Sequence, residues 1–538
     1  MAKACESSAV AEILKKLKDL KEYAKKTLAA AEEIEKVGAS NHCKLKHIEK
    51  QLDELFRQLE FDTRLIINTI NSKFPCVAPI IISSVPTTLS TPGTYCVVNN
   101  LTYTGTGTAI TVASDNVTIN FSKFRLNLTD PAATGISATG VTDLIINQAD
   151  IRLPVGTRST DAISNAILLS SSNHVTINDA YIYQTGIGLQ ANGVVDLKIN
   201  NFFAMDNGLA NLLFIASNEI TIDSANISNT LVDLAAAGIY INTSNNIIVK
   251  NSNFTNVNVL LLGVVNLISN HNNYLVNDPA FGLSLIQIGN NPSEALPVNN
   301  EELQFTNDNY ARLTNNAGPV AIFAILIARN LSIDKCIITN NGAGSYGIGV
   351  TSTTGAFPIN GVRITNNTIN GILQYPLFIN TNDPTIVIKA VFVQNNLISS
   401  SNTVDVETVG VFVDNSQNVL IQGNQITSSN ANGVGIGLEM GATNVLIDTN
   451  TISGQTQAGV VIGTGVTGNV LTANKFFGNG TGVSPNPAPG NLINADNVFF
   501  NDTVAPSPAK VVKREERRAQ TQKFIAKCSK VKLEKSSK

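Results

Sequence analysis

A short pattern of apolar and polar residues recurs along this chain from about residue 80 to residue 500. Each copy has an aliphatic residue, any residue, a second aliphatic residue, two polar residues, a small residue or Asn, one further residue, and then Ile, Phe or Tyr. Clear examples are Val117–Phe124, Val175–Ile182 and Val445–Ile452. Apolar residues that alternate with polar ones at a period of two predict β-strands with one buried face.

The first aliphatic residue of each copy anchors the count of the repeats. The fifteen anchors are Val117, Leu144, Val175, Leu197, Ile220, Ile247, Leu267, Leu303, Leu331, Val362, Val391, Val419, Val445, Val470 and Leu492. They divide 375 residues into 14 intervals of about 27 residues. A period in the twenties, with Gly or Asn at the turns, predicts an all-β solenoid of about 15 coils.

Several copies are followed by a second short strand that begins with Gly. These strands are Gly186–Leu189, Gly238–Ile241, Gly347–Val350, Gly410–Val413, Gly435–Leu438 and Gly459–Ile462. Other repeat folds fit less well, because leucine-rich repeats need a Leu-x-x-Leu-x-Leu framework and propeller blades are longer. A left-handed hexapeptide helix would show a six-residue period, which this chain lacks.

Asparagine recurs at one position of four successive copies, as Asn367, Asn396, Asn424 and Asn450. Equivalent residues of a parallel coil stack about 4.8 Å apart. A column of asparagines can therefore form hydrogen bonds between side chains and with the backbone of the turns. We expect a structural asparagine ladder at these four residues.

The first 75 residues differ from the repeats, since residues 9–37 and 42–72 carry small or apolar side chains at alternating spacings of three and four. This spacing predicts two helices with one apolar stripe each. The stripes have no core of their own, so either an inter-chain coiled coil or an intramolecular helical hairpin would bury them. We expect three parts: residues 1–75 as an oligomerisation stalk, 76–500 as the solenoid, and 501–538 as a linker and basic tail.

Charge is concentrated at the two ends of the chain. Residues 510–538 hold 11 Lys or Arg and 3 Asp or Glu, a net charge of +8, whereas residues 76–509 have a net charge of −13. The basic tail would attract an anionic partner such as nucleic acid, phospholipid or an acidic protein. The alternative is a solubilising or partly helical tail.

The sequence shows neither a targeting segment nor a metal motif. The opening MAKACESSAVAE lacks the apolar region of a signal peptide, and the longest apolar runs are too short for a transmembrane segment. The six cysteines have no metal-ligand spacing, so we expect neither a metal nor another cofactor. Cys76 and Cys96 flank the entry to the repeats, as a disulfide in an oxidising setting or as two free thiols.

The repeat unit resembles the parallel β-helix repeat of the pectate-lyase-like superfamily. The entry segment, Pro92–Val98 followed by Ala109–Ile119, is similar to the opening of many β-helix proteins of bacteria and large DNA viruses. The resemblance covers roughly residues 80–500 and implies a right-handed helix. It leaves the activity open, because the superfamily includes lyases, hydrolases, tailspikes, adhesins and inert virion parts. Its fibres with coiled-coil leaders imply a homotrimer.

The catalytic residues that the superfamily implies are incomplete in this sequence. The Gly-His-Gly and Arg-x-Lys of the hydrolases are absent, and the Arg-x-Pro-x-x-Arg of the lyases is approached only by Arg152–Arg158, which is one residue too long. Asp150, Asp161 and Asp179 lie nearby in sequence. Arg152, Arg158 and Asp161 are therefore candidates for catalysis, and the alternative is a loop whose arginines pair with these aspartates.

Asp414 and Glu439 form a second candidate pair, because they end two equivalent strands and should stack on adjacent coils. Carboxylates about 5 Å apart can act as a retaining glycosidase pair or hold a cation. Equivalent copies carry Gln190, Asn242 and Thr351, which favours an outward polar column instead. The insertions 275–300, 311–328 and 371–389 are candidate binding loops.

These observations favour a non-catalytic structural or attachment protein over an enzyme. The chain would belong to a virion or an extracellular surface, contact a capsid or surface protein, and bind a glycan. The rival hypothesis is a polysaccharide lyase or glycoside hydrolase. Stacking platforms for sugars should be scarce, because the chain has no Trp and only 6% aromatic residues.

Overall fold

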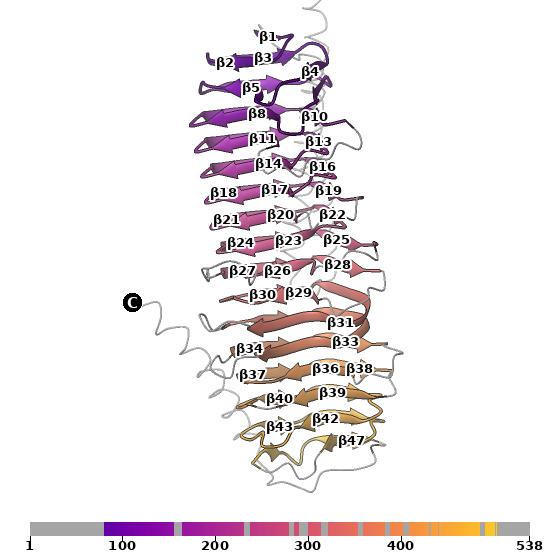
Figure 1. The fold of residues 1–538 in the computed structure, drawn as a ribbon. Helices are drawn as coiled ribbons and strands as arrows, with labels where there is room; N and C mark the ends of the chain where they lie inside the picture. Colours follow the sequence, from indigo (N-terminus) through magenta and orange to yellow (C-terminus); the bar gives the residue numbers. More distant parts are fainter. Residues whose placement is uncertain are drawn as a thin grey trace, which may run out of the picture. The chain divides into compact units, whose positions relative to one another are not determined.

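The chain winds into a right-handed parallel β-helix whose strands stack from coil to coil (Figure 1). The computed structural model describes residues 80–154, 164–230, 237–278, 284–289, 300–313, 321–352, 359–381, 388–401, 408–429, 432–439, 441–484, 490–500 and 502. The predicted helices 9–37 and 42–72 and the basic tail lie outside these residues. Residues 80–538 make up one structural unit and residues 1–79 another.

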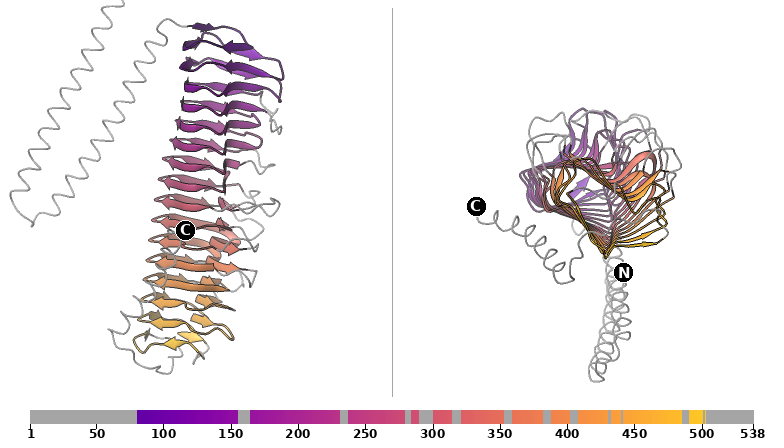
Figure 2. Two further views of the ribbon diagram at one scale, coloured as in Figure 1. Left: turned by 90° about the vertical axis from the view of Figure 1, so that its left-hand side faces the viewer. Right: turned by 90° about the horizontal axis from the view of Figure 1, so that it is seen from below.

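One sheet of 17 strands takes one strand from each coil, and a sheet of 30 strands forms the other walls (Figure 2). Within the described residues, the strands of neighbouring coils pair in parallel, as Val117 does with Leu144 and Val391 with Val419. The strands of the 17-stranded sheet are β1 (Ile80–Ile82), β3 (Gly93–Val97), β6 (Val117–Asn120), β9 (Thr142–Asn147), β12 (Asn173–Asn178), β15 (Val195–Asn200), β18 (Asn218–Asp223), β21 (Asn245–Lys250), β24 (Val265–Asn270), β27 (Glu301–Thr306), β30 (Ser332–Asp334), β32 (Arg363–Thr365), β34 (Ile388–Gln394), β37 (Ser416–Gln422), β40 (Leu446–Asp448), β43 (Val470–Thr472) and β46 (Leu492–Ile493).

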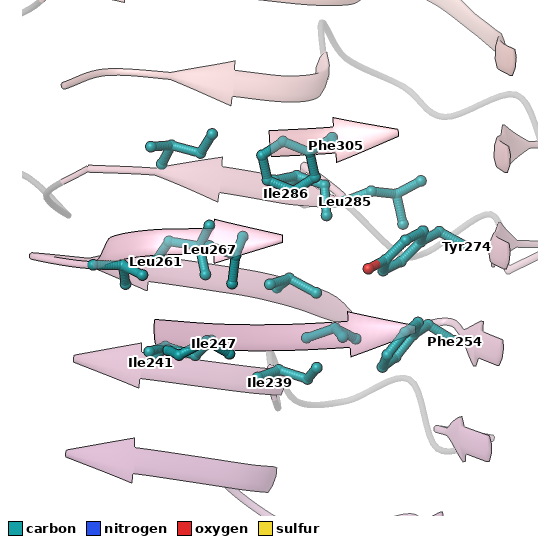
Figure 3. Close-up of a cluster of buried hydrophobic side chains, with 14 of the residues drawn as sticks. Ile239, Ile241, Ile247, Phe254, Leu261, Leu267, Tyr274, Leu285, Ile286 and Phe305 are labelled. Atoms are coloured by element: carbon teal, nitrogen blue, oxygen red, sulfur yellow. The ribbon is translucent and has the colours of Figure 1, made fainter. Parts of the chain in front are cut away.

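The core is one continuous column of aliphatic and aromatic side chains inside the coil (Figure 3). Because successive side chains of a strand point to opposite faces, every second residue enters this column. Phe254, Tyr274 and Tyr310 stack on successive coils, with centroid distances of 4.6 and 4.7 Å. The alternation seen in the sequence is therefore the alternation between the core and the outer surface.

All fifteen sequence anchors lie within a strand of the 17-stranded sheet or one residue before it. The predicted register is nevertheless wrong for the last two copies. Leu446 pairs with Val470, and Val470 pairs with Leu492, so the residues aligned with Val445 are Asn469 and Asn491. Both Val470 and Leu471 are apolar, and the sequence alone did not show that Leu471 is the one facing the core.

Most strands of this sheet are followed by a turn that contains a residue with left-handed backbone geometry. Asn201, Asn251, Asn366 and Asn395 occupy this position with φ between 52° and 57°. Asparagine tolerates this conformation better than most residues. The residues that directly follow Asn366 and Asn395 belong to the asparagine ladder.

The asparagine ladder is confirmed and is longer than predicted. Each of these four residues, Asn367, Asn396, Asn424 and Asn450, accepts a hydrogen bond at Oδ1. The donor is the backbone amide of the equivalent residue on the preceding coil, at 2.8–2.9 Å. Their Nδ2 groups donate to backbone carbonyls such as those of Ile364 and Val393. The ladder continues through Asn474 and Asn497, which are also buried.

Two further predictions concern the loop at residues 371–389 and the cysteines Cys76 and Cys96. Residues 371–381, expected to begin a binding loop, belong to strand β33 (Thr368–Thr381), in which Gly371 has a positive φ of 127° and lies close to the backbone of Asn340. Cys96 is buried and disulfide-bonded, and Cys76 lies outside the described residues.

Candidate functional site

Four aromatic rings meet on the outer face of three successive coils. They come from β31 (Ile337–Ser352), β33 and β36 (Thr408–Val413), which pair in parallel. In β36 the side chains of Val411 and Val413 are fully buried in the core, and Phe412 between them points outward and is half-buried. Alternation thus places Phe412, and Phe378 that pairs with it, outside the coil. Tyr346 and Tyr375 are half-buried, lie beside an irregularity in the strand register, and contact these two rings. We call Tyr346, Tyr375, Phe378 and Phe412 the aromatic platform.

The rings of the platform contact one another closely. Phe378 and Phe412 are stacked, with centroids 5.2 Å apart and planes 9° apart. Tyr346 and Tyr375 are also stacked, at 5.6 Å, and Tyr375 meets Phe412 edge-on at 5.4 Å. Partial burial raises the pKa of Tyr346, so its hydroxyl stays protonated at neutral pH.

Glycines border the stacked pair of phenylalanines along the column. Gly349 pairs with Phe378 on one side, and Gly437 pairs with Phe412 on the other. A side chain at either position would extend the column, whereas glycine leaves the neighbouring position empty. A Cβ at Gly437 would already lie 3.5 Å from the Phe412 ring. The edges of the platform are therefore open to a ligand.

A polar column runs beside the platform, two residues further along each strand. Thr351 pairs with Asn380, and the same register places Asn380, Asp414 and Glu439 on successive coils. Residues two apart in a strand are about 7 Å apart. Asp414 is therefore about 7 Å from Phe412 along the strand, and the polar column follows the edge of the platform.

Asp414 and Glu439 directly follow β36 and β39 (Gly433–Leu438), whose residues Val413 and Leu438 are partners. Their backbone amides donate to the carbonyls of the preceding coils at 2.8 and 2.9 Å. The two residues are thus on adjacent coils, in the arrangement expected from the sequence. The carboxylate of Glu439 lies over Gly463 of the next coil, where any side chain would meet it.

The carboxyl group of Asp414 is partly desolvated. Burial raises its pKa above the ordinary value, and a hydrogen bond from the backbone amide of Asn415 lowers it in part. Its buried Oδ1 has no hydrogen-bond partner within the described residues. A buried acceptor without a partner disfavours the charged form of the carboxyl group, in line with its raised pKa.

The other candidate cluster is occupied by its own ion pairs. Arg152 donates to both carboxylate oxygens of Asp150, at 2.6 and 2.9 Å, and Arg125 reaches the same carboxylate at 3.4 Å. The guanidinium of Arg152 also lies 4.4 Å from the ring centre of Tyr181. Arg158 and Asp161 lie outside the described residues. Arg152 therefore pairs with an aspartate, as the alternative hypothesis proposed.

The platform is hard to predict from the sequence, because its rings are scattered over 67 residues. The signal was present in the repeat register, since Phe378 and Phe412 occupy the same position of two copies. The described residues contain no group of three or more His, Cys, Asp or Glu side chains that could hold a metal ion. They also contain no helix long and apolar enough to span a membrane.

Comparison with known proteins agrees with the strand topology. The family described as "Right handed beta helix region" matches residues 323–499. The chain carries a right-handed β-helix repeat. The match includes the aromatic platform, the polar column and the asparagine ladder of this β-helix. No curated protein matches the sequence.

Several solved structures are similar to this β-helix. The A-module of a mannuronan C-5 epimerase from Azotobacter vinelandii is 14% identical over 82% of this chain and 94% of that chain, with a TM-score of 0.28. The tailspike protein of E. coli bacteriophage HK620, in complex with a hexasaccharide, is 10% identical over 81% and 73%, with a TM-score of 0.44. A surface protein and adhesin of Streptococcus pneumoniae is 12% identical over 75% and 91%, with a TM-score of 0.28.

Proposed function

We propose that this β-helix is a non-catalytic attachment protein that binds a glycan on its aromatic platform. The observation that carries the proposal is the cluster of four outward rings beside the polar column of Asn380, Asp414 and Glu439. A cluster of half-buried aromatic rings on the outer face of a protein otherwise rich in Asn, Thr and Ser favours a binding surface. A sugar has an apolar face for such rings and hydroxyl groups for the neighbouring oxygens.

The geometry suits a ligand that lies along the coil axis. The stacked rings of Phe378 and Phe412 offer apolar area, and the half-buried Asn380 and Asp414 of the polar column offer groups that can bond to hydroxyls. Burial of apolar area contributes about 25 cal/mol per Å², so contact of a sugar face with these rings would stabilise the complex. Because the coils repeat, a linear glycan could contact the same column on successive coils.

Catalysis at the same place is the second candidate, and one observation favours it. A general acid of a glycosidase needs a raised pKa, and burial raises the pKa of Asp414. Glu439 on the next coil would then act as the second carboxylate. We favour binding, because the residue sets of the known hydrolases and lyases are incomplete and Arg152 is already paired with Asp150.

A panel of uronic-acid and neutral polysaccharides, with and without calcium, separates the two functions. Binding is measured by isothermal titration, and cleavage by the release of reducing ends and of unsaturated products. We expect binding of at least one polysaccharide without products. Turnover that Asp414→Asn or Glu439→Gln abolishes would contradict the non-catalytic function.

The assembly that we propose follows the charge and pattern of the chain ends. Residues 1–75 would form a homotrimeric stalk that contacts a capsid or surface protein, at a virion or an extracellular surface. The basic residues of the segment 510–538 would contact an anionic partner. The β-helix would then present the platform to a glycan-bearing surface.

A further inference from the structure

Four apolar side chains form a stripe on the outer face of the 17-stranded sheet. Phe392, Leu420, Leu446 and Val470 pair in register on β34, β37, β40 and β43. They alternate with inward residues, and they form a hydrophobic cluster that is separate from the core. We call these four residues the outer stripe; its strands are neighbours in Figure 1.

The outer stripe is covered although it faces outward. Leu420 is only 1% exposed and Leu446 is 8% exposed. Ile145 and Ile248 occupy the same column on earlier coils, and they are 38% and 37% exposed. The same position on the same sheet is thus open on some coils and closed on others. A local cover over the later coils is the physical reason.

Within the described part of the chain, the guanidinium of Arg363 lies 5.0 Å from the ring centre of Phe392 and covers that end of the stripe, away from Leu420 and Leu446. The described strands belong to the two sheets of the coil, and none of them lies over the outer face of the 17-stranded sheet. The stripe spans four strands, about 14 Å at 4.8 Å per coil.

We propose that the C-terminal segment, residues 503–538, docks on the outer stripe. Its 36 residues follow the last coil, next to the end of the stripe, and belong to the same structural unit as the β-helix. Phe524, Cys528 and Val531 have the i, i+4, i+7 spacing of one helix face, with Ile525 beside them. A helix of ten residues is about 15 Å long, which matches the stripe.

The opposite charges of the C-terminal segment and the β-helix also favour this docking. The segment 510–538 has a net charge of +8, whereas residues 76–509 have a net charge of −13. When the apolar face docks, the lysines at 523, 527 and 530 face solvent or acidic residues of the coil. The segment would thus cover the side of the β-helix and present a basic outer surface.

Thiol labelling in the full-length chain tests this docking. Leu446→Cys places a thiol in the outer stripe, and Ile248→Cys places one at the matched open position. Maleimide labelling of each position is followed by peptide mass spectrometry, with and without Phe524→Asp and Ile525→Asp in the segment. Melting curves confirm that each variant retains the β-helix.

We expect the thiol at position 446 to react about tenfold or more slowly than that at position 248, because its exposure requires release of the segment. Phe524→Asp with Ile525→Asp should remove this protection and leave position 248 unchanged. Slow labelling at position 446 in both backgrounds would assign the cover to another segment and overturn the proposal. Fast labelling in both would show that the stripe is open, with the same consequence.

Discussion

The backbone amide and the Nδ2 group of Asn396 both donate to the side-chain oxygen of Asn424 on the next coil, at 2.9 Å each. Asn424 in turn donates to the carbonyl of Val393 and to Asn450. All these groups are buried. Each turn of the ladder is thus held by the side chain of the turn that follows it.

Replacing Asn424 by Ala should therefore destabilise the β-helix strongly. The substitution removes the acceptor of the Asn396 backbone amide and the Nδ2 donor to the carbonyl of Val393, both in a buried site. The Nδ2 group of Asn396 loses one of its two bonds and keeps the one to Ile364. Buried groups without a partner cost about 1–3 kcal/mol each, so we expect a loss of about 2–4 kcal/mol in the free energy of unfolding. Chemical denaturation followed by circular dichroism measures it.

Asn309 supplies the matched control. It also donates to an asparagine of a neighbouring coil, Asn273, at 2.9 Å, but it is exposed to water. Asn309→Ala should change the free energy of unfolding by less than about 0.5 kcal/mol. Equal effects of the two substitutions would contradict the structural role of the buried ladder.

Asp308 places a titratable group at the ladder position, between Asn272 and Cys336. It accepts hydrogen bonds from Ser269, Tyr310 and the backbone amide of Asn272. Burial outweighs these bonds and raises its pKa from 3.8 to about 6. The neighbouring thiol and phenol groups stay neutral in this range, because burial raises the pKa of Cys336 to about 12 and that of Tyr310 well above its ordinary value.

A raised pKa means that the folded state binds the proton more tightly than the unfolded state. The stabilisation is complete below about pH 4 and is lost as the pH rises through about 6, by up to about 3 kcal/mol. Asp308→Asn should remove this loss and stabilise the protein at pH 7. Unfolding measured from pH 4 to pH 8 tests it, with the exposed Asp143→Asn as control. A parallel pH dependence in the Asp308→Asn variant would contradict the assignment.

A trimeric stalk would fix the molar mass of the protein in solution. If residues 1–75 form a trimeric coiled coil, the full chain should have three times the monomer mass of 57.1 kDa. Residues 76–538 alone should be monomeric. Light scattering measures both, and a monomeric full chain would exclude an inter-chain stalk.

The sequence predicted the parts of the fold that depend on periodicity. Alternation identified the strands and the core, and the recurring asparagines identified the ladder, because stacking turns equal positions into neighbours. Periodicity failed where both faces of a strand are apolar. The pattern allows either Val470 or Leu471 to face the core. The structure places Leu471 in the core, and Val470 is apolar because it belongs to the outer stripe.

The candidate site was predicted only in part. The stacking of Asp414 and Glu439 follows from their equivalent strands, and the sequence showed it. The platform requires the exact coil-to-coil register of long strands, because Tyr346, Tyr375 and Phe378 lie in segments whose lengths differ from the average repeat. No count of aromatic residues reveals that these few rings meet.

The most direct test of the account is the affinity of platform variants for the best-bound polysaccharide of the panel. Phe378→Ala with Phe412→Ala removes the stacked pair, and Tyr181→Ala with Phe203→Ala removes another outward stacked pair, whose centroids are 4.4 Å apart. Isothermal titration should show an affinity loss of about tenfold or more for the first variant, from about 1–3 kcal/mol of lost ring contacts, and no change for the second. Unchanged affinity in the first variant would contradict glycan binding on the platform.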